Sequence, residues 1–87
     1  MKRYHRNLKV ESAEMTDELG MLNIETGRYH VLDSVGKDVW NLIENPVTVE
    51  SIVAELVKEY DVDELTCKND VEVFIDLMLE KQLVLEV

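Results

Sequence analysis

The pattern of hydrophobic and polar residues changes its period near residue 33. Before that point, apolar residues alternate with polar ones or form short runs, as expected of short β-strands. After it, apolar residues recur three or four positions apart, which is the spacing of helices that bury one face. The pattern predicts an α+β domain in which a small sheet precedes several helices.

We expect three short antiparallel strands in the first part of the chain. They lie around residues 8–12, at 19–24 and at 28–32. The segment Glu25-Thr26-Gly27 separates the last two strands and indicates a tight turn, because Gly27 can adopt a positive φ at no steric cost.

Capping residues and a proline set the bounds of three expected helices. The first follows Asp33 or Ser34 and ends before Pro46, since the residue before a proline disfavours the helical region. Thr48 caps the second helix, which ends near Tyr60. The expected third helix begins between Asp63 and Asn69 and runs to about Gln82, and the apolar tail 83–87 is expected to be extended.

The third helix has more apolar surface than one core face requires. At about 100° per residue, most of its apolar side chains form one face. Val73 and Leu77 fall outside this face and widen the apolar arc to roughly 240°, whereas a surface helix needs a stripe only somewhat wider than 100°. Either these two residues line a groove for a partner, or a strand or the C-terminal tail covers them.

The strand at residues 28–32 ends the predicted meander and is therefore an edge. Tyr29 and Val31 project to one face, while Arg28, His30 and Leu32 project to the other. An exposed edge strand must be either protected from unwanted pairing or used for binding. The alternative to binding is that Arg28 and His30 protect this short edge. Together with the over-wide helix, a free edge makes a groove suited to binding a peptide by strand addition.

Charge and size restrict the partners. The chain has 87 residues, enough for one domain, and a net charge of −10. Residues 1–10 contain four basic residues and no acidic one, so residues 11–87 carry −14. We expect residues 1–7 to be a flexible basic arm and residues 8–87 to form the domain. An acidic body opposes nucleic acid and anionic membranes; it suits a basic partner or serves only solubility.

No set of residues for catalysis, metal binding or cofactor binding is visible. Cys67 is the single cysteine, which excludes an internal disulfide and fits a reducing cytoplasm. His5 and His30 are far apart and form no zinc site with it. No glycine-rich phosphate loop, cleavable signal or membrane span is present. We expect no enzyme activity and no cofactor.

An ordered set of short motifs resembles the PqqD-like family, which is named after pyrroloquinoline quinone biosynthesis. The motifs are Leu22-Asn23, Gly27-x-Tyr29, Leu32-Asp33, Gly36, Val39-Trp40-x-Leu42-Ile43, Thr48-Val49, Ile52, Leu56, Tyr60-Asp61-Val62-Asp63, Asp70-Val71, Phe74-Ile75 and Leu83-Val84. Gln82 stands where the family often has glycine, and Asp33 where asparagine is common.

The resemblance implies a winged helix-turn-helix fold, with a three-stranded antiparallel sheet followed by three helices, that recognises precursor peptides. The leader segment of the precursor would add to the strand at 28–32 and pack on the third helix. The implied peptide-binding residues are Arg28, Tyr29, His30, Val31, Leu32, Asp70, Val73, Phe74, Leu77 and Lys81. A stand-alone chain of this kind is similar to the leader-binding component of lasso-peptide pathways, which works with a leader peptidase and a macrocyclase.

Two other functions fit parts of the sequence. Within the family, the alternative is service to a radical SAM enzyme in quinone biosynthesis or other peptide modification. Outside it, the winged helix-turn-helix fold also occurs in transcription regulators, but fold does not decide function. From residue 61 to residue 87 there are eight acidic and two basic residues, so a helix in that region would meet phosphate with the wrong sign.

Overall fold

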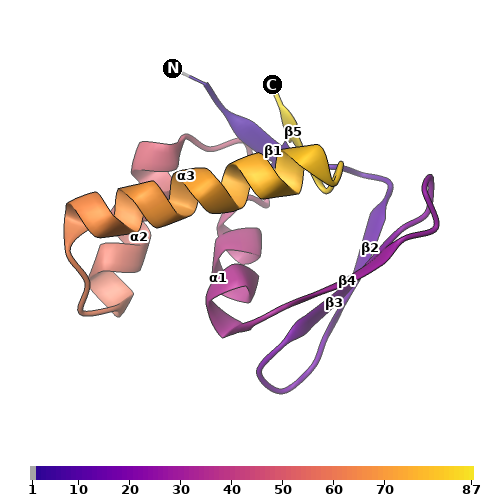
Figure 1. Cartoon of the computed structure of the whole chain (residues 1–87), viewed down its shortest axis with the longest axis horizontal. Coiled ribbons are helices and arrows are strands. Elements are labelled where there is room, and N and C mark those ends of the chain that lie inside the picture. The colour runs from indigo at the N-terminus through magenta and orange to yellow at the C-terminus, as the bar shows by residue number, and fades with distance from the viewer. Residues whose placement is uncertain (1) are drawn as a thin grey trace.

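The computed structural model describes residues 2–87, which form two small sheets and three helices (Figure 1). The strands are β1 (Tyr4–Arg6), β2 (Val10–Glu14), β3 (Leu19–Asn23), β4 (Tyr29–Leu32) and β5 (Val84–Glu86). The helices are α1 (Ser34–Leu42), α2 (Val49–Glu59) and α3 (Glu64–Glu80). The predicted α+β class, with a three-stranded antiparallel sheet ahead of three helices, is confirmed.

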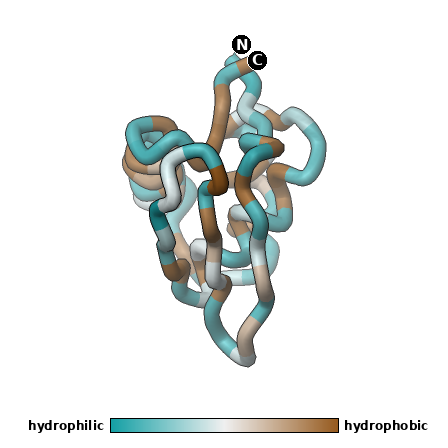
Figure 2. Tube along the Cα trace, turned by 90° about the vertical axis from the view of Figure 1, so that its right-hand side faces the viewer, coloured by the Kyte–Doolittle hydropathy of each residue, from teal (hydrophilic) through white to brown (hydrophobic). Residues whose placement is uncertain are grey.

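Strands β2, β3 and β4 form the predicted antiparallel meander. Figure 2 shows these strands side by side, with apolar and polar residues alternating along them. The turn between β3 and β4 has Gly27 at a φ of 74°, as its sequence predicts. The Asn23 side chain holds this turn, because its Oδ1 accepts hydrogen bonds from the N–H groups of Glu25 at 2.9 Å and Thr26 at 3.2 Å.

Each helix begins at a side-chain cap within its expected range. Asp33 accepts a hydrogen bond from the Gly36 N–H at 2.8 Å and begins α1. Thr48 caps α2, and Asp63 caps α3 by accepting from the Thr66 N–H at 3.1 Å. The caps are local in sequence, which is why the sequence predicts them well.

The segment expected to be a flexible arm is partly a strand. Tyr4–Arg6 form β1, which pairs antiparallel with β5, and Tyr4 is only 8% exposed. The Arg6 guanidinium donates two hydrogen bonds to the Trp40 carbonyl, at 3.0 and 2.8 Å, and lies over the indole ring. The expectation of a flexible arm is therefore wrong for residues 4–6, while residue 1 lies outside the described residues.

The hydrophobic core lies between the three helices and the inner face of β3. Its fully buried members include Trp40, Ile43, Met21, Ile75 and Met78. The tail contributes Leu83 and Val84, which are also fully buried. The ends of the chain thus lie together at one side of the helices (Figure 1).

The end of α3 is fixed by a left-handed turn. The N–H of Leu83 bonds to the Met78 carbonyl at 2.9 Å, and the N–H of Gln82 bonds to Leu79 at 3.1 Å, which is the Schellman arrangement. Gln82 has a φ of 60°, a conformation that favours glycine. Two buried asparagines, Asn7 and Asn23, donate their side-chain amides to the Gln82 carbonyl. This joins the helix end to β3.

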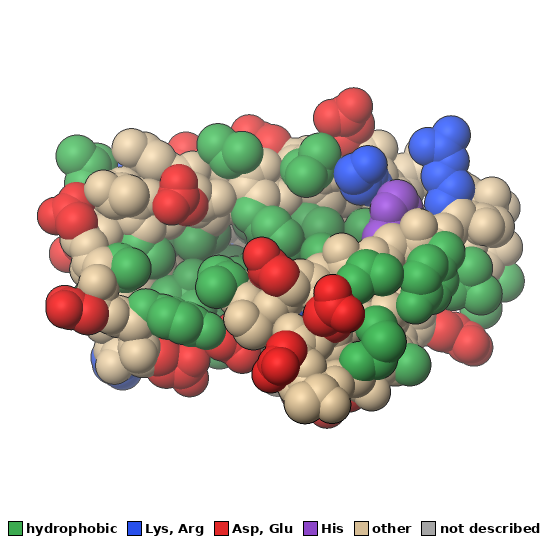
Figure 3. Space-filling view, turned by 60° about the horizontal axis from the view of Figure 1, so that its bottom comes forward, with side chains coloured by type: hydrophobic (Ala, Val, Ile, Leu, Met, Phe, Trp, Pro, Cys, Tyr) green, Lys and Arg blue, Asp and Glu red, His purple; other side chains and the backbone are tan. Residues whose placement is uncertain are grey.

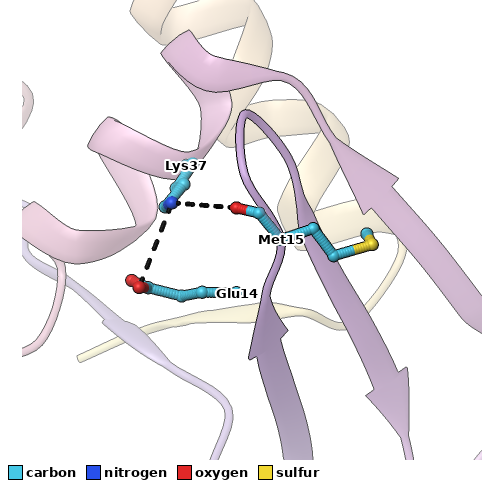
Figure 4. Close-up of polar contacts among 3 residues, drawn as sticks. All are labelled: Glu14, Met15 and Lys37. Atoms are coloured by element: carbon cyan, nitrogen blue, oxygen red, sulfur yellow. Dashed lines mark hydrogen bonds and ion pairs between the residues drawn. The ribbon is translucent and has the colours of Figure 1, made fainter.

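A lysine joins the far end of the meander to the first helix (Figure 4). The Lys37 ammonium donates a hydrogen bond to the Met15 carbonyl at 3.4 Å and lies 4.0 Å from the Glu14 carboxylate. Since Lys37 belongs to α1, this contact sets how the hairpin of β2 and β3 sits on the helices.

Among the described residues, none of the helices is long and apolar enough to cross a membrane.

Candidate functional site

Strand β4 is an open edge whose free backbone groups can be identified. The N–H of Asn23 bonds to the Arg28 carbonyl at 2.9 Å, and opposite residues in an antiparallel pair alternate between bonded and non-bonded pairs. His30 and Leu32 therefore turn their N–H and C=O groups toward β3. Tyr29 and Val31 turn theirs toward the open side, where within residues 2–87 no further strand pairs with β4.

The apolar surplus of α3 is exposed, as one of the two readings of the sequence predicts. Val73 is 68% exposed and Leu77 is 45% exposed. The C-terminal tail does not cover them, because it forms β5 and pairs with β1. The reading in which the tail or a strand covers these residues is therefore wrong.

The end of β4 meets α1 and α3 around a glycine. A Cβ atom at Gly36 would lie 3.1 Å from the Leu32 Cβ, which is closer than ordinary contact, and 3.4 Å from the Phe74 ring, which is in van der Waals contact. Leu32 and Phe74 are both half-buried and pack against the core. Glycine at position 36 thus lets α1 lie close to the strand and to the third helix.

From this junction an apolar hollow of about 360 Å³ extends between the three helices. Its walls include the predicted site residues Asp70 and Phe74. The other lining residues are Asp33, Val35, Gly36, Val39, Leu56, Tyr60, Val62, Thr66, Cys67 and Val71. Sequence reasoning missed this hollow, although the apolar Val62 within an otherwise acidic connection was a signal for it. Figure 3 shows apolar side chains gathered along the hollow.

One wall of the hollow is held by a hydrogen bond between two helices. The Tyr60 hydroxyl donates to the Asp38 carboxylate of α1. This hydrogen bond is the main reason why the pKa of Tyr60 is raised to about 12. The phenol is thus a donor at any physiological pH, and it fixes the connection between α2 and α3 against α1.

The opposite end of the β4 edge is basic. Arg28 precedes β4, His30 lies within it, and Lys81 ends α3. Asn23 joins these segments, because its N–H bonds to the Arg28 carbonyl and its side-chain amide bonds to the carbonyl of Gln82, next to Lys81. Burial lowers the pKa of His30, and the positive charges of Lys81 and Arg28 lower it further. The His30 Nε2 atom is buried and has no hydrogen-bond partner within the described chain.

The predicted site residues therefore fall into three groups. The backbone groups of Tyr29 and Val31 form the edge, while their side chains lie on the outer face of the sheet, with Tyr29 over Gly20. Val73 and Leu77 form an exposed wall on α3, Phe74 and Asp70 line the hollow, and Leu32 lies beside Gly36 of its wall. The basic end holds Arg28, His30 and Lys81.

Cys67, which lines the hollow, is not in surroundings that activate its thiol. Cys67 belongs to the core, and burial, together with the charges of Asp70 and Glu64, raises the pKa of its thiol, which disfavours the reactive thiolate. No group of three potential metal ligands occurs between residues 2 and 87. The arrangement instead offers hydrogen bonds along one side and apolar contacts along the other.

Magnitudes show why both sides matter for binding an extended chain. Four ladder hydrogen bonds contribute a net of roughly 2–6 kcal/mol, whereas association costs an estimated 4–15 kcal/mol. Two or three buried guest side chains add about 1.5–3 kcal/mol each. The edge alone would bind weakly, and the apolar wall makes useful affinity attainable.

Two solved structures are similar to this chain over almost its whole length. The solved structure described as TbiB1 in complex with the TbiA(beta) leader peptide is 35% identical, with a TM-score of 0.86, and the match covers 92% of this chain and 93% of that one. A second solved structure, lasso peptide synthetase B1 complexed with the leader peptide, has a TM-score of 0.84 at 15% identity and covers 94% and 96% of the two chains. The second match shows the shared fold alone.

The search of curated proteins found no match. The model of the family described as coenzyme PQQ synthesis protein D (PqqD) matches residues 18–84, which include β3, β4, all three helices and the start of β5. The chain belongs to the PqqD family.

Proposed function

We propose that the protein binds the leader segment of a ribosomally made precursor peptide by strand addition to β4. The observations that carry this proposal are the edge of β4, which has no partner strand within residues 2–87, and the exposed Val73 and Leu77 of α3, the helix whose Phe74 meets the end of β4 at Gly36. The guest strand would bond to the backbone of Tyr29 and Val31. Its inward side chains would pack on α3 and reach the hollow beside Phe74.

The solved complex of TbiB1 supports this proposal. That protein carries a leader peptide, is 35% identical to this chain and matches almost its whole length. The second solved structure, described as a lasso peptide synthetase B1, shares the fold, and we extend the proposal to a lasso-peptide pathway. In such a pathway this chain would hold the precursor while a leader peptidase and a macrocyclase act on it, and its own role would be non-catalytic.

The outer face of the meander offers a surface for such an enzyme. Its side chains include the exposed Met15, Leu22, Tyr29 and Val31, which lie on the face opposite the core. Figure 3 shows apolar side chains gathered over this part of the molecule. A guest strand on β4 would extend this face with its own outward side chains, so an enzyme docked there would contact both the domain and its bound peptide.

The name of the matched family favours a second candidate. Service to a radical SAM enzyme in quinone biosynthesis would use the same edge with a different peptide and a different enzyme. The two candidates differ in the neighbouring genes. A short precursor gene beside a peptidase and a cyclase supports the lasso pathway, and a radical SAM enzyme supports the second candidate.

Fluorescence anisotropy with a labelled TbiA(beta) leader peptide tests the binding step. We expect saturable binding to the wild-type protein and loss of binding in Leu77→Asp, because a carboxylate would be buried against the guest. Circular dichroism checks that the variant is folded. At about 100 μM protein, only binding weaker than roughly −5.5 kcal/mol escapes detection. Absence of binding to the wild type at this concentration contradicts the proposal. Equal binding by both proteins contradicts the assigned site.

A further inference from the structure

The two ends of the groove between β4 and α3 carry side chains of opposite charge. Arg28, His30 and Lys81 lie at the end where β4 begins and α3 finishes, because Asn23 bonds both to the Arg28 carbonyl and to the carbonyl of Gln82, next to Lys81. Asp33 and Asp70 lie at the other end, in the walls of the hollow. Figure 3 shows a histidine with basic side chains beside it at one end of the apolar surface, and acidic side chains around the remainder. Two basic residues at one spot are notable in a chain of net charge −10.

These two basic residues are free to bind a guest. Three other lysines form ion pairs with carboxylates, namely Lys2 with Glu86, Lys37 with Glu14 and Lys58 with Glu55. Arg28 and Lys81 form no such pair within the described part of the chain, and both are exposed. Their positive charges instead face His30, which costs free energy if the histidine is protonated. A guest carboxylate would relieve this repulsion.

We propose that Arg28, His30 and Lys81 form a carboxylate-recognition subsite that fixes the direction of the bound peptide. This inference rests on the proposed leader-binding function. An acidic guest residue is attracted to this end of the groove and repelled at the other end by Asp33 and Asp70. Arg28 and Lys81 are the donors, and protonation of His30 adds a third positive charge.

The sheet geometry then orders the charges in the guest. The strand pairs among residues 2–87 are antiparallel, and antiparallel pairing is slightly more stable per residue. A guest antiparallel to β4 passes Leu32 first and Tyr29 later. Its acidic residue therefore follows, toward the C-terminus, the apolar residues that fill the hollow. A peptide with the same residues in reversed order would place its carboxylate beside Asp33 and Asp70.

Selection from a random peptide library tests this inference without knowing the natural precursor. An mRNA-displayed library of 16-residue random peptides is selected on the wild-type protein, on Leu77→Asp and on the charge-reversed double variant Arg28→Glu/Lys81→Glu. Lys68→Glu serves as the matched control, because Lys68 is an exposed cation of α3 that lines a different hollow, with Tyr4 and Val49. All proteins are first checked by circular dichroism.

We expect wild-type protein and Lys68→Glu to enrich peptides with Asp or Glu C-terminal to an apolar segment. The double variant should enrich Lys or Arg at that position and bind the wild-type peptides about tenfold more weakly, as for a partly exposed charged hydrogen-bonded contact. Should the double variant misfold, Arg28→Gln/Lys81→Gln replaces it, with loss of the acidic preference expected.

The outcomes separate the two proposals. If wild type enriches peptides that Leu77→Asp does not bind, but without an acidic preference, the carboxylate subsite is wrong and the groove stands. The carboxylate subsite is also wrong, and the groove stands, if the charge-reversed variant keeps the preference for acidic peptides. If no enriched peptide depends on Leu77, the proposed leader-binding groove itself fails.

Discussion

The meander has two free edges, and they differ in what lies beside them. Strand β4 ends at Leu32, which lies with Phe74 of α3 around Gly36, a residue in the wall of the hollow between the helices. Strand β2 forms the other edge, and it carries Glu11 and Glu14, the second of which faces Lys37. The walls of the hollow contain no residue of either strand, so β4 reaches the hollow through this junction at Gly36. Both strands offer backbone hydrogen bonds, but only β4 offers them beside apolar surface.

This difference shows that an unpaired edge is not by itself a binding site. A guest on β2 would gain the ladder hydrogen bonds, roughly 2–6 kcal/mol, without enough apolar burial to exceed the cost of association. Acidic side chains on β2 also protect that edge against unwanted pairing. We therefore expect peptide binding to depend on β4 and its helix, and not on β2.

The largest expected effect comes from the apolar wall. Leu77→Asp should weaken binding of the TbiA(beta) leader peptide by about 100-fold, since it removes about 1.5–3 kcal/mol of burial and places a charge at the interface. Leu65→Asp is the matched control, because Leu65 is an exposed leucine near the start of the same helix and outside the hollow. Fluorescence anisotropy measures both. Equal losses in the two variants would show that α3 is not the wall.

Proline substitutions compare the two edges directly. Val31→Pro removes an N–H that faces the open side of β4, and we expect about tenfold weaker binding from the lost hydrogen bond and the altered backbone. Ser12→Pro removes the corresponding outward N–H of β2 and should leave affinity unchanged. The same titration measures both. A loss in Ser12→Pro with none in Val31→Pro would assign the guest to the wrong edge.

The left-handed residue after α3 gives a stability prediction. Gln82→Gly should raise the free energy of unfolding by about 0.5–1 kcal/mol, because glycine adopts a φ of 60° without steric cost. Gln82→Ala keeps a Cβ atom and should give no such gain. Urea unfolding followed by circular dichroism measures both variants. A gain in Gln82→Ala equal to that in Gln82→Gly would mean that backbone strain is not the cause.

The contact of Lys37 with Met15 and Glu14 should contribute only slightly to stability. Lys37→Met removes the ammonium that bonds Met15 and faces Glu14, and we expect a loss of about 0.5 kcal/mol in the free energy of unfolding. Affinity for the leader peptide should not change, because β4 is untouched. A tenfold loss of affinity would show that the position of the hairpin controls the groove.

The smallest expected effect is a pH dependence from His30. Its pKa in the folded protein is lowered by burial and then by Lys81 and Arg28, so the unfolded chain binds a proton more readily. This histidine therefore makes folding less favourable as pH falls below about 6.5, its ordinary pKa. Between pH 7.5 and 5.5, the wild-type unfolding free energy should fall more steeply than that of His30→Gln. Parallel curves would contradict the lowered pKa.

The sequence predicts the local features of this molecule and misses the long-range ones. The helix caps at Asp33, Thr48 and Asp63 each depend on a few adjacent residues, and so does the turn at Gly27. The exposed Val73 and Leu77 follow from helical periodicity alone.

Strand β1 could not be predicted in the same way. It has three residues, and its partner β5 lies at the other end of the chain. Hydrophobic periodicity cannot reveal so short a strand, because β1 is held in an extended conformation by pairing with a strand that is distant in sequence. The hollow was missed for a similar reason: it is built from three helices whose relative placement depends on packing.

Amide hydrogen exchange followed by NMR tests the central claim most directly. At saturating TbiA(beta) leader peptide, the N–H groups of Tyr29 and Val31 should exchange more slowly than in the free protein, because a guest strand would occupy them. The outward N–H groups of Ser12 and Glu14 should exchange at unchanged rates. Protection at Ser12 and Glu14, or none at Tyr29 and Val31 in a saturated complex, would contradict strand addition at β4.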